Sequence, residues 1–241
     1  GCAFETGFVR QGLKVGLELE QELGFNPMQV GFIAATDSHN SNPGDVEEWD
    51  YPGAAGAVTS SALRRLRADV ETAAHKSNIR FYTAGGLAAV WAPENTREAI
   101  FDALARRETY ATSGPRMTVR LYAGWGIDAS IANEVDPVPS LMTNAVPMGG
   151  VLQADATQQE SPGFFVWAAR DPIDAPLQRL QMIKGWIDAE GKTHEKVVDI
   201  ACADGLTVDR AMGRCPDNGA SVDLDSCSFS ADAGTDELKT V

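Results

Sequence analysis

The hydrophobic pattern of the chain changes period near residues 112–116, and this change constrains the fold more than any other feature. Before this point apolar residues recur at helical spacing. After it, Met117, Val119 and Leu121 alternate with polar residues, which is the pattern of a half-buried strand. We therefore expect an α/β region at residues 1–111, followed by a β-rich domain at 112–241 that resembles an antiparallel sandwich.

Three helices are expected in the first region, at 6–23, 60–75 and 96–107. The first ends at Gly24, and the third has a start resembling a capping box, with Asn95 and Glu98 three residues apart. The apolar stripe of that third helix would comprise Ile100, Phe101 and Leu104.

Strands are expected from uninterrupted apolar runs and from alternation. The run at 28–35 has no polar alternation, which predicts a strand buried on both faces. Further strands are expected at 163–169, 178–187 and 193–201, the last two joined by a turn at Gly191.

Charge excludes two classes of partner. The 241 residues include 34 acidic and 20 basic ones, a formal net charge of -14 that repels nucleic acid and anionic lipid surfaces. No apolar run approaches the roughly 20 residues needed to span a bilayer. We expect neither nucleic acid binding nor a membrane span.

The four cysteines are spaced too widely for a zinc knuckle. Cys202, Cys215 and Cys227 lie in a Gly- and Asp-rich stretch, where a disulfide would close a loop and indicate an oxidising compartment. The alternative is that all four are buried or idle thiols of a cytosolic protein, and Cys2 could have had its partner in a missing N-terminal region.

Asp37-Ser38-His39 directly follows the apolar run at 28–35. In an extended segment Asp37 and His39 project to the same side, so together they could bind zinc, manganese or iron. The alternative is that Asp37 caps a turn and His39 donates to a backbone carbonyl. His75 and His194 lie in polar surroundings and are expected to be exposed.

The Thr112-Ser113-Gly114 turn lies beside Arg116, an arrangement suited to an anionic group of a small-molecule substrate. The alternative is a plain helix-to-strand connection. A serine hydrolase is disfavoured because the chain has no Gly-x-Ser-x-Gly elbow.

Several longer motifs together resemble a bacterial family of unassigned function, often secreted, that is related to the polymerase-and-histidinol-phosphatase (PHP) superfamily of metal-dependent phosphoesterases. The motifs are Phe8-Val9-Arg10, Gly31-Phe32-Ile33 leading to Thr36-Asp37-Ser38-His39-Asn40, Gly85-Gly86-Leu87, the stretch 101–114, and Lys184-Gly185-Trp186.

This resemblance implies the C-terminal part of a PHP-type β/α barrel that holds two or three metal ions, with Asp37 and His39 matching two of the ligands. The family's His-x-His is missing, so the chain resembles a C-terminal fragment that also stops short of the family's end. We expect the parent to be a metal-dependent hydrolase, periplasmic or secreted. The fragment should bind metal weakly, hydrolyse nothing measurable and self-associate through exposed sheet edges.

The rival hypothesis is a non-catalytic extracellular binding or structural module. Its surface would then use aromatic side chains rather than Asp37, namely Trp49, Tyr51, Trp125 and Trp186.

Overall fold

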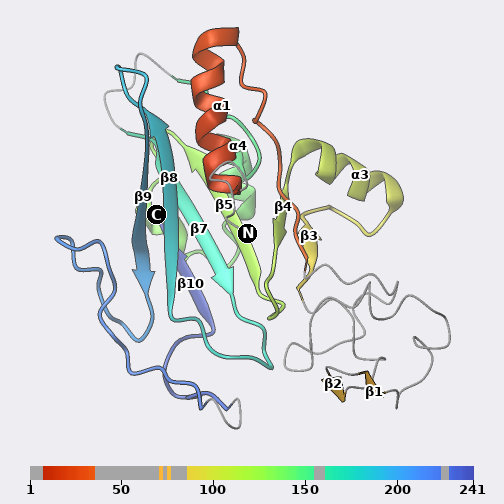
Figure 1. Cartoon of the computed structure of the whole chain (residues 1–241). Coiled ribbons are helices and arrows are strands. Elements are labelled where there is room, and N and C mark those ends of the chain that lie inside the picture. The colour runs from red at the N-terminus through yellow and green to blue at the C-terminus, as the bar shows by residue number, and fades with distance from the viewer. Residues whose placement is uncertain (1–7, 36–70, 73–74, 77–85, 155–160, 224–227) are drawn as a thin grey trace.

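A four-stranded antiparallel sheet lies at the centre of the computed structural model, which describes residues 8–35, 71–72, 75–76, 86–154, 161–223 and 228–241 (Figure 1). The strand order is β10-β7-β5-β6. Their bounds are β5 Thr118–Gly124, β6 Val146–Pro147, β7 Gly163–Ala169 and β10 Glu237–Thr240. The alternation after residue 116 therefore did predict a strand, and the run at 163–169 matches β7.

A long hairpin packs across one face of this sheet. It consists of β8 (Arg179–Ile187) and β9 (Thr193–Cys202), paired from Arg179↔Cys202 to Ile187↔Thr193. Gly191 in the connecting turn has φ 79°, a left-handed conformation that glycine adopts without the steric cost of a Cβ. The expected strands and their turn are confirmed.

Alternation on β5 and β7 supplies apolar side chains to both faces of the sheet. On one face Val166 and Ala168 pack with Leu177 and Leu180 from the hairpin side. On the other, Tyr122 and Phe165 pack with Leu141 of α4 (Val138–Asn144), which is preceded by a 3-10 helix at Ala129–Asn133. Successive residues of a strand face opposite ways, so one strand serves two apolar layers.

Helix α1 (Val9–Leu23) lies along the β8–β9 hairpin (Figure 1). It ends at Gly24 in the left-handed conformation, whose N–H donates to the Glu20 carbonyl, as expected for a glycine at a helix C-terminus. Thr193 donates to the Glu18 carboxylate at 2.9 Å. The first predicted helix is confirmed, and it packs on the β-rich half of the chain.

Strands β3 (Ala88–Val90) and β4 (Thr109–Ala111) form a separate antiparallel pair that carries α3 (Arg97–Arg106) between them. The helix is confirmed, but its cap is Thr96, whose side chain accepts from the Ala99 amide, and not Asn95. Thr96 has the extended backbone that a cap requires.

The expected apolar stripe of α3 is not buried. Phe101 is 68% and Leu104 42% exposed, whereas Ala99 and Ala103 are the buried positions. Small side chains allow the helix to approach its strands closely, which leaves the larger apolar side chains outside.

The run at 28–35 is not a buried strand, and this prediction is wrong. It begins in a turn, where the Val30 N–H donates to the Met28 carbonyl at 2.9 Å, and it makes no ladder among the described residues. Val30, Phe32 and Ile33 are 51%, 41% and 59% exposed. An apolar run describes what a segment can bury, but a strand also needs a neighbour that completes its hydrogen bonds.

The helix expected at 60–75 is also wrong where the structure describes it. Glu71–Thr72 (β1) pairs with His75–Lys76 (β2), Glu71 facing Lys76. The remaining positions of that prediction, 60–70, lie outside the described residues, and they include most of the spacing on which it was based.

The described part of the chain is thus mixed α/β with antiparallel sheets, and none of the sheets it forms closes into a barrel. Within the same ranges, no helix has the length and apolar character that crossing a membrane demands.

Candidate functional site

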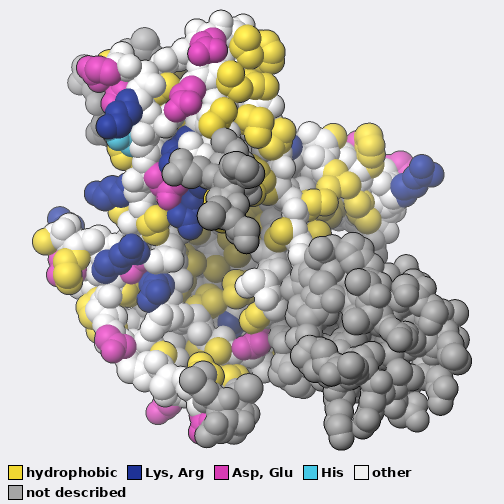
Figure 2. All heavy atoms as spheres, viewed as in Figure 1, with side chains coloured by type: hydrophobic (Ala, Val, Ile, Leu, Met, Phe, Trp, Pro, Cys, Tyr) yellow, Lys and Arg dark blue, Asp and Glu magenta, His cyan; other side chains and the backbone are white. Residues whose placement is uncertain are grey.

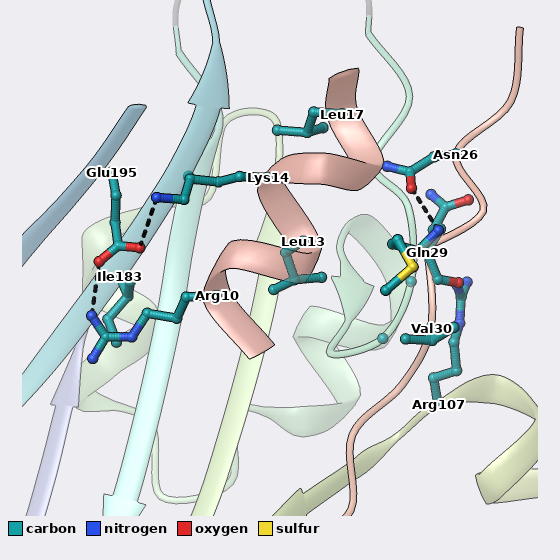
Figure 3. Close-up of a pocket in the computed structure, with 14 residues that line it drawn as sticks. Arg10, Leu13, Lys14, Leu17, Asn26, Gln29, Val30, Arg107, Ile183 and Glu195 are labelled. Atoms are coloured by element: carbon teal, nitrogen blue, oxygen red, sulfur yellow. Dashed lines mark hydrogen bonds and ion pairs between the residues drawn. The ribbon is translucent and has the colours of Figure 1, made fainter. Parts of the chain in front are cut away.

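A cavity of about 320 Å³ lies between α1, the segment that follows it, and the β8–β9 hairpin (Figure 3). The Gly149-Gly150 turn and the end of α3 complete its wall. The lining residues are Arg10, Leu13, Lys14, Leu17, Asn26, Met28, Gln29, Val30, Arg107, Gly149, Gly150, Ile183, Gly185 and Glu195. Five separate parts of the chain therefore meet here.

One end of the cavity carries two cations on a single carboxylate. Arg10 Nη1 lies 2.8 Å from Glu195 Oε1, and Lys14 Nζ lies 3.8 Å from Glu195 Oε2. Arg10 and Lys14 are one helical turn apart on α1, so both reach the same point of β9. The Lys14 and Glu195 side chains are 20% and 24% exposed.

Arg107 stands at the other end, with Leu13 between the two ends (Figure 3). It has φ 63°, and its Nη1 donates to the Gln29 carbonyl at 2.8 Å. Among the described residues no carboxylate forms an ion pair with it. This guanidinium therefore keeps donors available for a further oxyanion.

Glycines make the close approach around Arg107 sterically feasible. A Cβ on Gly149, which has φ 82°, would overlap the Arg107 carbonyl oxygen, and one on Gly31 would lie 2.8 Å from Arg107 Cβ. Real Cβ atoms do not approach so closely. The turn at 149–150 and the segment at 31 therefore confine Arg107 from two sides.

The middle of the cavity is apolar. Leu13 and Ile183 are 38% and 46% exposed, Met28 is 37% exposed, and Leu17 and Val30 complete this surface. Charged ends and an apolar middle together suit a small organic anion rather than a bare inorganic one.

The structure does not bring the predicted substrate-binding turn to this cavity. The buried Thr112 joins its backbone N–H and Oγ1 to Leu87, at 2.9 and 3.0 Å, which ties the end of β4 to the start of β3. Ser113 and Arg116 are exposed. The Arg116 amide donates to the buried Asp171 carboxylate at 2.8 Å.

Asp37 and His39, the predicted metal ligands, lie outside the described residues. Within the ranges that the structure describes, no three His, Cys, Asp or Glu side chains gather as a metal site would require.

His194 is half-buried rather than exposed, and the sequence missed its partners. Its Nε2 lies 2.5 Å from Asp188 Oδ2, and its ring stacks on Trp186 at a centroid distance of 5.3 Å. Hydrogen bonds from His194 and from the Lys192 amide lower the pKa of Asp188 below its ordinary value. Trp125, another tryptophan of the rival hypothesis, donates its Nε1–H to the Gln153 carbonyl at 3.2 Å.

The predicted disulfide is present. It joins Cys202 to Cys215, which are 13 positions apart in the sequence. Cys2 and Cys227 lie outside the described residues.

The whole chain, residues 1–241, matches the model of the family described as "Protein of unknown function (DUF3604)". The chain belongs to this family. Comparison with curated proteins and with solved structures gives no significant match.

Sequence patterns did not reveal the residues of the cavity. Arg10 and Lys14 carried a signal, two cations four residues apart on an amphipathic helix, whereas Glu195 is 185 residues from Arg10 and no local pattern joins them. Arg107 resembled any exposed cation at a helix end.

Proposed function

We propose that the chain is part of a metal-dependent hydrolase of the PHP type, in which Asp37 and His39 bind a divalent cation such as zinc, manganese or iron. The observation that carries the proposal is the direction of the segment at 28–35. This segment ends two residues before Asp37 in the sequence.

Two hydrogen bonds define that direction. Arg107 Nη1 donates to the Gln29 carbonyl at 2.8 Å, and Thr109 Oγ1 donates to the Phe32 carbonyl at 2.7 Å. The partners rise together in sequence number, so the segment runs parallel to β4, as the trace after α1 also shows (Figure 1). Parallel neighbours are typical of α/β sheets, in which sites follow the carboxyl ends of strands.

The same geometry supports a role for the turn after β4. Thr112, Ser113 and Arg116 follow the carboxyl end of β4, and Asp37 follows the carboxyl end of the parallel segment. In the proposal, Arg116 and the hydroxyl-bearing turn bind an anionic group of the substrate. We also propose that the hydrolase has a β/α barrel and that its substrate is a small molecule.

The chemistry follows from the ligands. Held by Asp37 and His39, a divalent ion would act as a Lewis acid that neutralises charge growing on a phosphoryl or carbonyl oxygen. A multinuclear site needs more ligands than Asp37 and His39, and we propose that a longer parent supplies them. The 241-residue chain alone should bind metal weakly and hydrolyse nothing measurable.

The test is metal analysis of the parent protein purified without chelator, beside its Asp37→Ala and His39→Ala variants. The expected result is two or more equivalents in the parent and a loss on either substitution. Asp102→Ala, a change on the exposed face of α3, serves as the control and should leave the metal content unchanged. A parent without metal would overturn the proposal.

We also propose a periplasmic or secreted location. The Cys202–Cys215 disulfide supports it, since such bonds persist mainly in oxidising compartments.

A further inference from the structure

The cavity between α1 and the β8–β9 hairpin has a charge that differs from that of the molecule. The chain has a formal net charge of -14, yet the cavity is lined by three cations and one carboxylate. In so acidic a protein most cations have carboxylates close enough to pair with. A cavity that retains an excess of positive charge is therefore unusual, and it attracts anions locally.

Arg107 carries one of the two surplus positive charges, and it carries it without a paired carboxylate. At the other end Glu195 forms ion pairs with both Arg10 and Lys14, which leaves one net positive charge there, with both cations already paired to the same carboxylate. Arg107 instead donates to a neutral carbonyl, and the described residues offer it no carboxylate. A guanidinium presents several donors in a fixed plane, which matches the oxygens of a carboxylate or a phosphoryl group.

Neighbouring backbone also restricts the position of Arg107. Its backbone is left-handed, Gly149 packs against its carbonyl and Gly31 against its side-chain stem. A cation whose position is set before binding loses less entropy when a ligand arrives.

The apolar side chains of the cavity indicate that the rest of the ligand is apolar. Leu13, Met28 and Ile183 present half-exposed apolar side chains to the cavity. Leu13 lies between the two charged ends, and Ile183 lies beside Glu195 (Figure 3). Figure 2 shows hydrophobic side chains gathered over the upper part of the molecule, where α1 lies. A ligand with an apolar group that covers the apolar side chains of the cavity would remove them from water.

We propose that this cavity binds a small organic anion, with its carboxylate or phosphoryl group on Arg107 and its apolar body against Leu13, Met28 and Ile183. The site involves neither Asp37 nor His39, so it goes beyond the proposed hydrolase function and can be tested in the 241-residue chain without metal.

The test is ligand-observed NMR titration of the chain with phenyl phosphate, benzoate, inorganic phosphate and benzyl alcohol. Phenyl phosphate or benzoate should bind about tenfold more tightly than both inorganic phosphate, which lacks the ring, and benzyl alcohol, which lacks the charge. The comparison of phenyl phosphate with benzoate identifies the preferred anionic group.

Two variants separate the parts of the site. Arg107→Gln should weaken phenyl phosphate about tenfold, since it removes a charge-assisted hydrogen bond. Leu13→Ser should weaken phenyl phosphate while leaving inorganic phosphate unchanged. Arg106→Gln is the matched control, because Arg106 is paired with Glu108 at 2.6 Å and does not line the cavity.

Equal affinity for phenyl phosphate and inorganic phosphate would overturn the proposal, as would binding that Arg107→Gln and Leu13→Ser both leave unchanged. Urea unfolding of each variant shows whether it is folded. Since Leu13 is 38% exposed, its replacement should leave the fold intact even if Arg107→Gln does not.

Discussion

The guanidinium of Arg120 lies 3.7 Å from the centre of the Trp91 ring, and this contact joins the β3–β4 pair to the central sheet. Arg120 also donates to the Tyr122 hydroxyl at 2.7 Å, and Trp91 Nε1 donates to the Val119 carbonyl at 2.9 Å. Trp91 in turn stacks on Tyr110 of β4. Since Tyr122 is only 2% exposed, the cluster connects the half-buried Arg120 to the core.

Replacing Arg120 should therefore destabilise the chain without creating a large cavity. Arg120→Met loses the cation–π contact and leaves the Tyr122 hydroxyl without this donor, for a combined cost of about 2 kcal/mol in the free energy of unfolding. Urea unfolding measures it. Arg210→Met, at an exposed position of the loop after β9, is the matched control, and an equal effect of both changes would contradict the role of the cluster.

Gly149→Ala should destabilise the chain because a Cβ would overlap the Arg107 carbonyl oxygen and because φ is 82°. Gly205 separates these causes: it has φ 67°, but a Cβ added there would meet no atom within 4 Å. Gly205→Ala should cost about 1 kcal/mol, the strain of a left-handed residue. Gly149→Ala should cost clearly more in the same urea titration, and a similar cost for both would show that the close packing is unimportant.

Asp199 should make stability depend on acid pH. Burial raises the pKa of this carboxyl, but hydrogen bonds from the Cys215 amide, Gln181 and Arg214 outweigh it, so the pKa lies below the ordinary value of 3.8. A carboxyl with a lowered folded-state pKa contributes stability above 3.8, and that contribution is lost as the pH falls further.

The measurement is the urea midpoint of the wild type and of Asp199→Asn at pH 7 and at pH values below 3.8. The difference should be about 2 kcal/mol at pH 7 and should shrink in acid. A difference that stays constant with pH would show that the carboxylate charge is irrelevant. Asp102→Asn controls for the loss of one exposed negative charge.

Reduction of the Cys202–Cys215 disulfide should lower the melting temperature. The bond joins two cysteines 13 positions apart in the sequence. Because it restricts the unfolded chain, it should contribute about 3 kcal/mol to the free energy of unfolding. Thermal melts with and without reductant measure the change. The double variant Cys202→Ser with Cys215→Ser should melt at the same temperature in both conditions; a reductant effect that persists in it would place the effect elsewhere.

The chain should self-associate through the apolar side chains that α3 and the segment before residue 36 expose. Phe101 is 68% and Ile33 59% exposed, and exposed apolar area of this kind promotes association. Light scattering should show a mass that rises with concentration and a smaller rise for Phe101→Ser. Glu98→Ser, on the same helix, is the control. A monodisperse monomer at all concentrations would contradict the prediction.

Local patterns were sufficient where one segment carries all the information that its structure needs. The end of α1 at Gly24, the alternation of β5 and the turn at Gly191 are each set by a few neighbouring residues, because backbone sterics and side-chain period act over short range. The cysteines likewise indicated a disulfide, since their loop-rich surroundings are visible in the sequence.

Long-range contacts explain the rest. The run at 28–35 has the apolar content of a buried strand, but its burial depends on neighbours that the run itself does not specify. The cap of α3 is the local exception: Thr96 rather than Asn95 caps the helix because the extended backbone at Thr96 places its side chain against the Ala99 amide. The cavity unites Arg10, Arg107 and Glu195 from three distant parts of the chain, since packing and not sequence separation brings side chains together.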